Sequence, residues 1–341
     1  MVEDMVLRND MRVLFIRMKF LLVVATLTAC GGGGGGGGGN GIVPVTYNGN
    51  TSAALVDISN AHDLARNSYE HSSSGTASVG AFAASLSDPH MLGQDSGLPR
   101  AVNVIRSVLS MFEQVNVQAM TEANPVAKAT VSVSDTLSGS CGGSAKLTLS
   151  ADDQTGVFSG RISYSNFCEM EVVIGGDMTV SGVIDLFWGS IESITLNFAA
   201  VRTQVQGASV TITGSIALSI PGSSAESLLN MVMRNDTTGF VYQLENMQVD
   251  VTSGAGYVDM TMEGRIYEPI QGYLDVTTVS AFRVYDGNNW PSSGELIGVG
   301  AVGGLSGNTQ VRFRAFTSTY LVEADTTGDG SFDFSQTYDW E

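Results

Sequence analysis

Four oxygen-bearing residues near the carboxyl end have the spacing of the start of a calcium loop. They are Asp325, Thr327, Asp329 and Asp333, in a stretch that also holds two glycines. Calcium takes about six to eight oxygen ligands, and carboxylates around a glycine turn can begin to supply them. However, Gln336 stands at the twelfth position, where such loops place a bidentate Glu. Two interpretations stay open, a calcium site and a plain Asp/Gly hairpin turn, and we prefer the turn.

Other motifs are weaker signals of chemistry. Gly298–Gly303 has the glycine spacing of a dinucleotide-binding loop, but that motif needs a following helix, and the sequence there predicts a strand. His62, His71 and His90 all lie in the N-terminal region, and no serine elbow accompanies them. We expect His62 to face solvent. The chain is therefore expected to bind no organic cofactor and to lack enzymatic activity, with an exported hydrolase as an alternative.

Cys30 ends a segment that has the form of an export leader. A cationic start that includes Arg12 and Arg17 precedes an apolar run, Phe20–Leu27, which is too short to span a bilayer. The last four residues, Leu-Thr-Ala-Cys, resemble the lipobox of bacterial lipoproteins. This resemblance implies that residues 1–29 are removed and that Cys30 is acylated. Each buried methylene contributes about 0.8 kcal/mol, so two or more acyl chains anchor a protein stably.

Nine glycines, Gly31–Gly39, follow Cys30 directly and indicate a flexible tether behind an anchor. The alternative is an ordinary cleaved signal peptide followed by a chance cysteine, but a folded secreted domain has little use for such a tether. In lipoproteins, a residue other than Asp after the lipidated Cys implies sorting to the outer membrane, and here that residue is Gly31. Residues 1–10 do not suit a leader, so we expect translation to start at Met11 or Met18.

The composition narrows the classes of partner. The net charge is −18, and so acidic a surface repels phosphate backbones, which makes nucleic acid a poor partner. Only 15% of the residues are charged, and much of the polarity comes from Ser, Thr and Gly. That balance is typical of exported β proteins.

Two further cysteines, Cys141 and Cys168, are expected to form a structural disulfide. An exported chain meets an oxidising compartment. The sequence between the cysteines predicts two strands joined by a turn at Asp152–Gly156. The turn lies midway between the cysteines, so a hairpin places them opposite each other at its open end, close enough to bond.

The periodicity of apolar residues changes along the chain. After an extended entry at Val45–Asn50, the pattern predicts a helix from Ala61 through Tyr69, capped by Ser59 or Asn60. A second helix is predicted at Val102–Phe112. From about Lys128 the period becomes two, most clearly in Val210–Ile220, where Ser and Thr dominate the opposite face.

Turn signals separate about a dozen expected strands, and no predicted helix interrupts them, so we expect an antiparallel meander. Glycines recur two positions before an apolar residue in the expected strands, at Gly160, Gly182, Gly214, Gly264 and Gly294. A strand glycine permits a bulge or a sharp bend. We therefore expect a mainly β fold with one or two short N-terminal helices and a strongly curved sheet, either a half-open or a closed barrel.

Three segments carry a resemblance to uncharacterised, glycine-tethered lipoproteins of Gram-negative bacteria: SCGGSAKLTL, NFCEME and VEADTTGDGSFDF. The resemblance implies an outer-membrane location and carries no known activity. The expected organisation is a signal peptide at 1–29, a lipidated Cys and tether at 30–44, a helical and loop region at 45–126, and a β domain at 127–341.

Three functions are compatible with this organisation. The preferred one is a non-enzymatic binding or scaffolding lipoprotein that takes a hydrophobic ligand or an envelope protein as its partner. The alternatives are a lipid-anchored transmembrane β-barrel and the hydrolase. Trp188, Trp290 and Trp340 are expected to fill the core, although a ligand groove is the other interpretation.

Overall fold

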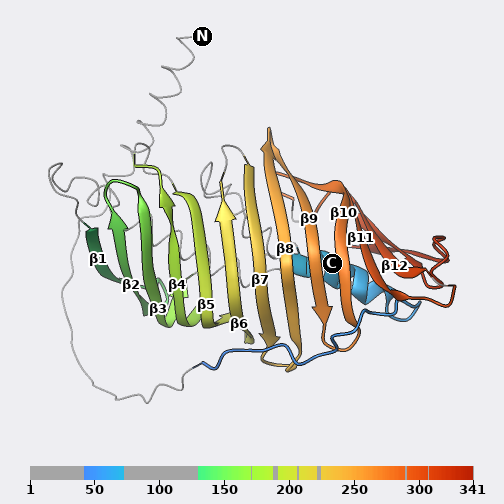
Figure 1. The fold of residues 1–341 in the computed structure, drawn as a ribbon, viewed down its shortest axis with the longest axis horizontal. Helices are drawn as coiled ribbons and strands as arrows, with labels where there is room; N and C mark the ends of the chain where they lie inside the picture. Colours follow the sequence, from blue (N-terminus) through green and yellow to red (C-terminus); the bar gives the residue numbers. More distant parts are fainter. Residues whose placement is uncertain are drawn as a thin grey trace, which may run out of the picture. The chain divides into compact units, whose positions relative to one another are not determined.

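The computed structural model describes residues 42–72 and 130–340, apart from 170, 187–190, 206, 221–223, 289 and 306. Fourteen strands form one antiparallel sheet in the order of the sequence (Figure 1), which confirms the predicted meander. The strands are β1 (Thr130–Ser138), β2 (Gly142–Asp152), β3 (Val157–Glu169), β4 (Val172–Ile184), β5 (Ile191–Val205), β6 (Ala208–Ser219), β7 (Ser224–Asn235), β8 (Val241–Gly254), β9 (Tyr257–Glu268), β10 (Gly272–Tyr285), β11 (Ser293–Val302), β12 (Asn308–Phe316), β13 (Thr319–Asp325) and β14 (Phe334–Asp339).

Alternation along each strand produces a buried face and a more exposed face. In β6, Ile212, Ile216 and Leu218 are buried, whereas Ser219 is exposed, as the period of two predicts. We call the face that carries these apolar side chains the inner face and the opposite one the outer face. The same alternation holds in β12, where Phe313 is on the inner face.

The sheet is open within the described strands. β1 pairs only with β2, and β14 pairs only with β13. These two strands form the edges of the sheet and do not pair with each other. The sequence predicted either a half-open or a closed barrel, and the closed barrel is not observed. The fourteen strands slightly exceed the expected dozen.

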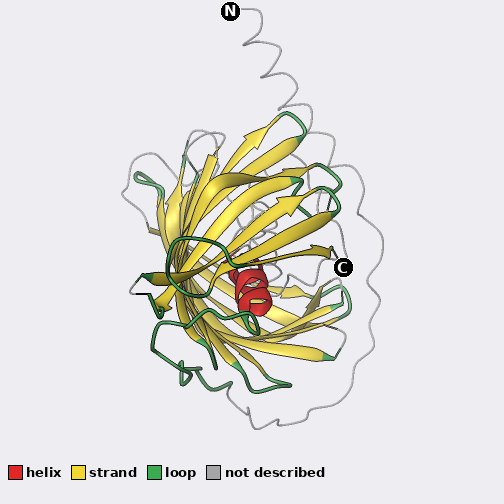
Figure 2. Ribbon diagram, turned by 90° about the vertical axis from the view of Figure 1, so that its right-hand side faces the viewer, coloured by secondary structure: helices red, strands yellow, loops and turns green. Residues whose placement is uncertain are grey.

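One helix, over residues 61–72, lies against the inner face (Figure 2). Its position agrees with the prediction, and Asn60, one of the two predicted caps, precedes its first residue and accepts the first helical hydrogen bond, from the Leu64 N–H, at 2.9 Å. Asp57 closes the turn that leads into the helix. The Asp57 carboxylate accepts hydrogen bonds from the N–H groups of Ser59 (2.7 Å) and Asn60 (3.1 Å), and the Asn60 amide oxygen accepts one from the Asp57 N–H (2.8 Å). Such reciprocal bonding satisfies free N–H groups at the helix start.

The apolar side of this helix fills the inner face over β10–β13. Leu64, Ala65 and Tyr69 are buried, and the Tyr69 ring stacks on Phe313 at 4.8 Å between centroids. No helix within the described part of the chain is long and apolar enough to cross a membrane. The second predicted helix, Val102–Phe112, lies outside the described residues.

An extended segment, residues 42–57, crosses the strands before the helix begins, and we call it the N-terminal strap. Its Val45 N–H donates to the Thr213 hydroxyl of β6 (2.9 Å). Farther along, Ala54 bridges two strands, because its N–H donates to Tyr273 of β10 (2.8 Å) and its carbonyl accepts from Ala301 of β11 (2.7 Å). Figure 1 shows this blue segment running along the ends of the strands.

Bulges interrupt the ladders opposite two of the strand glycines singled out in the sequence. Asn246 has a φ of +50° where the β8–β9 register shifts, and Gly264 of β9 lies beside it with a φ of +154°. A Cβ on Gly264 would lie 2.6 Å from the Cα of Met247. Gly214 of β6, with a φ of +124°, is paired with Phe198 at a β5 register shift, and a Cβ on it would clash with the Asn230 oxygen of β7. Glycine is required here because the bulged backbone approaches too closely for a side chain.

Candidate functional site

The loop proposed for calcium is a turn between β13 and β14, and its Asp325 is almost completely buried. The two carboxylate oxygens of Asp325 accept hydrogen bonds from the N–H groups of Gly328 and Gly330, each at 2.7 Å. Burial raises the pKa of Asp325, but the backbone donors outweigh this effect and hold the pKa below its ordinary value. A carboxylate with these contacts explains the turn without an ion.

The other three proposed ligands also have partners within the loop. Asp333 accepts from the Thr326 N–H (3.1 Å), Asp329 accepts from the Ser331 N–H (2.8 Å), and the Thr327 hydroxyl lies 3.4 Å from Asp325. Across the residues that the structure places, no three His, Cys, Asp or Glu side chains are grouped to hold a metal. The contacts favour the plain turn.

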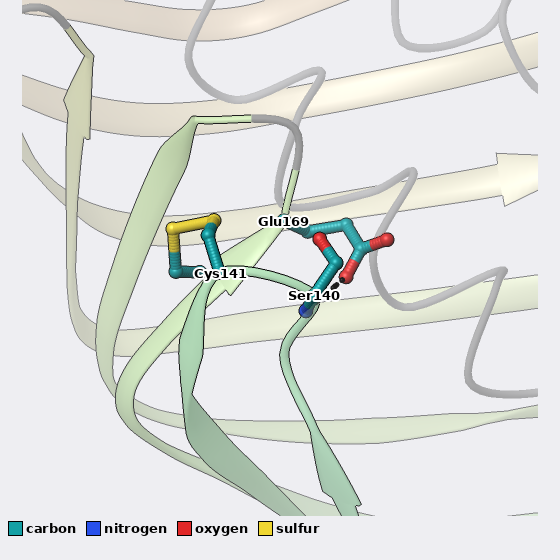
Figure 3. The surroundings of a disulfide bond; sticks show 4 residues. Ser140, Cys141 and Glu169 are labelled. Carbon is teal, nitrogen blue, oxygen red and sulfur yellow. Dashed lines mark hydrogen bonds between the residues drawn. A yellow bond between two sulfur atoms is a disulfide. The ribbon is translucent and has the colours of Figure 1, made fainter.

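The predicted disulfide joins Cys141 and Cys168, whose Cα atoms are 5.1 Å apart (Figure 3). The β2–β3 hairpin turns at residues 153–156, as expected, and places Cys168 opposite Gly142 at its open end. The Glu169 carboxylate accepts a hydrogen bond from the Ser140 N–H at 3.3 Å beside the bond. The disulfide therefore closes the open end of the hairpin and has a structural role.

The structure corrects the expectation for one histidine and gives another an unexpected place. His62 does not project freely into solvent: its Nε2 lies 2.9 Å from the Tyr320 hydroxyl, and its ring lies 4.1 Å from that of Tyr338. His71 sits at the other end of the helix against the inner face. His90 and Cys30 lie outside the described residues.

His71 belongs to a polar group around the buried Glu268 that we call the His71–Glu268 cluster, with the half-buried Tyr242, Asn67 and Tyr47 as its other members. The His71 Nε2 lies 3.9 Å from Glu268 Oε1, and the His71 ring lies 4.4 Å from that of Tyr242. The Glu268 side chain is only 8% exposed. Glu268 ends β9 and Tyr242 lies near the start of β8, so neighbouring strand ends meet the carboxyl-terminal part of the helix.

The Glu268 carboxyl is incompletely satisfied. Asn67 hydrogen-bonds to it, yet Oε1 has no hydrogen-bond partner. The Tyr47 hydroxyl of the strap donates to the backbone oxygen of Glu268 at 2.9 Å. This bond attaches the strap to β9 and leaves the Glu268 carboxyl without an additional donor. A buried carboxyl in this state avoids ionisation.

Burial controls the charge of the cluster. It raises the pKa of Glu268 from 4.5 to about 8, a shift that Asn67 opposes and the charge on Asp63 reinforces. It also lowers the pKa of His71 from 6.5 to about 4. Both side chains are therefore uncharged at pH 7. The pair can exchange a proton in principle, but its burial under the helix favours a structural role over catalysis.

An aromatic group surrounds the only described tryptophans. The rings of Trp290 and Trp340 stack at 4.7 Å, and Trp340 also contacts Phe313 and Tyr320. The cavity between this group and Tyr69 has a volume of about 10 Å³, which is room for about one water molecule. These contacts favour the core interpretation for Trp290 and Trp340 over the ligand groove.

The outer face carries arginines paired with carboxylates on neighbouring strands. Arg312 lies 2.6 Å from Glu323, and Arg283 lies 2.6 Å from Asp259. Such pairs contribute little to stability when exposed. They do neutralise these arginine charges locally, so the outer face offers an anionic partner few free cations.

Within the described residues, these observations define a class of fold: an open antiparallel meander that is crossed by an N-terminal strap and has a helix packed against part of its inner face. The sequence matches no known protein family, and neither curated proteins nor solved structures gave a match.

Proposed function

We propose that this protein is a non-enzymatic lipoprotein, anchored in the outer membrane of a Gram-negative bacterium through acylated Cys30, and that it is a scaffold for another protein of the cell envelope. The leader, the lipobox resemblance and Gly31 support the location. A net charge of −18 favours a neutral or basic partner.

The N-terminal strap is the observation that carries the proposal. A domain held by its N-terminus must pass any pull on the tether into its own core. The strap does so because it contacts β6, β9, β10 and β11 in turn, through the Val45 N–H, the Tyr47 hydroxyl and the backbone of Ala54. A force applied to the tether at residue 42 is therefore distributed over several strands before it reaches the helix.

Packing beneath the helix supports a scaffold over a carrier of hydrophobic ligands. A carrier needs an apolar cavity of several hundred Å³ with an open mouth, whereas the cavity beside Tyr69 and Trp340 has a volume of about 10 Å³. The proposal includes a half-open, curved sheet, supported by the bulges opposite Gly214 and Gly264. In this form the sheet wraps its own helix and presents its outer face to the partner.

Mass spectrometry of the protein extracted from the envelope tests the anchoring. We expect a chain that starts at Cys30, with a mass increase of acyl chains on its first residue. The control is Cys30→Ala, which removes the acceptor thiol and should release the protein in unacylated form. An unmodified Cys30 in the wild-type chain would contradict the proposal.

A further inference from the structure

Five apolar side chains, each more than half exposed, lie at one end of the sheet, and we call them the apolar rim. They are Leu55, Ile58, Ile270, Val302 and Leu305. Ile270 lies in the turn between β9 and β10, and Leu305 lies in the turn between β11 and β12. In a meander these two turns are at the same end of the strands, and the strap supplies Leu55 beside them.

Hydrogen bonds between neighbouring groups bring Leu55, Ile270 and Val302 together. The Asn60 side chain donates to the Leu55 carbonyl (2.9 Å) and to the Gln271 side chain (3.2 Å), and Gln271 follows Ile270. Ala54, which precedes Leu55, accepts from the N–H of Ala301 (2.7 Å), which precedes Val302. Isolated exposed apolar residues need no explanation, but a group of this kind marks an interaction site.

The two turns that supply Ile270 and Leu305 carry no charge, although the acidic turn between β13 and β14 lies beside them, where the Leu305 N–H donates to the Thr327 carbonyl at 3.0 Å. Residues 269–271 are Pro-Ile-Gln, and residues 303–307 are Gly-Gly-Leu-Ser-Gly. Asp57 lies next to Ile58 in the sequence, but its carboxylate is bonded to the Ser59 and Asn60 N–H groups of the helix cap. The carboxylates of the neighbouring β13–β14 turn accept hydrogen bonds within their own loop. In a chain with a net charge of −18, the two uncharged turns are therefore the part of this end that is suited to a neutral apolar surface.

The connection to the proposed anchor selects the occupant. Eleven residues separate Cys30 from Ile42, so the anchor lies within about 40 Å of the strap even when the tether is fully extended. A glycine-rich chain of this length spans roughly 18 Å on average. The Ile42 side chain lies beside Gly175, because a Cβ added to Gly175 would be 3.4 Å from Ile42 Cδ1. Gly175 is close to the start of β4, and β4 starts at the same end of the sheet as the rim.

We propose that the apolar rim rests on the lipid bilayer that holds the anchor, so that Leu305 and Ile270 enter the interface between headgroups and acyl chains. This inference rests on the proposed anchoring and adds an orientation to it. The strands then rise from the membrane with the turns between β8 and β9 and between β10 and β11 pointing away from it.

A depth measurement on the full anchored chain tests the orientation. A fluorophore is attached to a single cysteine introduced by Leu305→Cys, and the protein is reconstituted into phosphatidylcholine vesicles with or without brominated acyl chains. The matched control is Ala255→Cys, in the exposed turn at the opposite end of β9. Cys141 and Cys168 are bonded to each other and Cys30 is acylated, so each variant has one free thiol.

Bromine should quench the label at position 305 by about half or more and leave the label at position 255 unchanged, because interfacial groups enter by roughly 5–10 Å. Equal quenching at both positions, or none at 305, would overturn the orientation. If a protein partner and not lipid covers the rim, bromine does not quench the label at position 305, and the orientation is overturned. If the mass of the chain shows no acyl group, the anchoring has failed separately. Unanchored chain that carries Cys30→Ala, and so keeps one free thiol, is then added to the same vesicles to test the rim, and quenching at 305 alone would still support it.

Discussion

Replacing Glu268 with Gln should remove a dependence of stability on pH above pH 6.5. Glutamine keeps the shape of the side chain and a carbonyl oxygen for Asn67, but it cannot ionise. The folded carboxyl has a pKa of about 8 against 4.5 for the unfolded value, and His71 has about 4 against 6.5. Each group thus gives folding a proton linkage of opposite sign.

For Glu268, whose pKa is raised by folding, the stability contribution is complete below pH 4.5 and is lost as the pH rises towards 8. For His71, whose pKa is lowered, the contribution is complete above pH 6.5 and is lost as the pH falls towards 4. The two slopes cancel between pH 4.5 and 6.5. Between pH 6.5 and 8 only Glu268 acts, and the folded state holds one extra proton.

The expected loss follows from that single proton. One proton over 1.5 pH units, the interval from 6.5 to 8, corresponds to about 2 kcal/mol. Urea unfolding followed by tryptophan fluorescence at the two ends of this interval measures it. The wild-type protein should lose about this free energy of unfolding, and Glu268→Gln should lose none of it.

Glu263→Gln is the matched control, because Glu263 is exposed on the same strand. It should keep the full wild-type loss. If Glu268→Gln also kept the loss, or if the wild-type protein showed none, the reasoning about the buried cluster would be refuted.

Three further predictions concern the turns and the disulfide. Replacing Cys141 and Cys168 with Ala should lower the free energy of unfolding by about 3–4 kcal/mol, given their separation of 27 residues; an unchanged urea midpoint would contradict it. Gly264→Ala should cost about 1–3 kcal/mol because of its φ of +154° and the close backbone, whereas Gly304→Ala, which meets open space, should cost little. Asp325→Ala should lower the free energy of unfolding by about 1–3 kcal/mol, because it leaves buried N–H groups unpaired. If the loop is a plain turn, millimolar calcium should leave the Tm of the wild-type protein unchanged, whereas a calcium site would raise that Tm.

Much of the fold follows from local sequence signals. The meander was predictable because turn residues such as Asp152 and Gly156 separate segments of strict alternation, and such segments pair with their neighbours in sequence. The Cys141–Cys168 bond was predictable from the same hairpin. Its two ends are fixed by the turn midway between them.

The strap and the buried cluster were not predictable. The strap binds mostly through backbone groups, which leave no pattern in the side chains, and its partners are more than a hundred residues away. His71 and Glu268 lie about two hundred positions apart in the sequence, so only the docking of the helix brings them together. The part that Asp57 plays before the helix was not predicted, because Asp57, Ser59 and Asn60 are all good capping residues and local sequence does not choose among them.

Native mass spectrometry tests most directly the claim that this protein is a packed scaffold and not a carrier. The protein extracted from the envelope is weighed under native and then under denaturing conditions, so that covalent acyl groups on Cys30 remain in both measurements. A packed scaffold has the same mass in both measurements, and the space beside Tyr69 and Trp340, which holds about one water molecule, supports this result for the described part of the inner face. A lipid-sized adduct that is present in the native mass and lost on denaturation would contradict the scaffold and establish a ligand carrier.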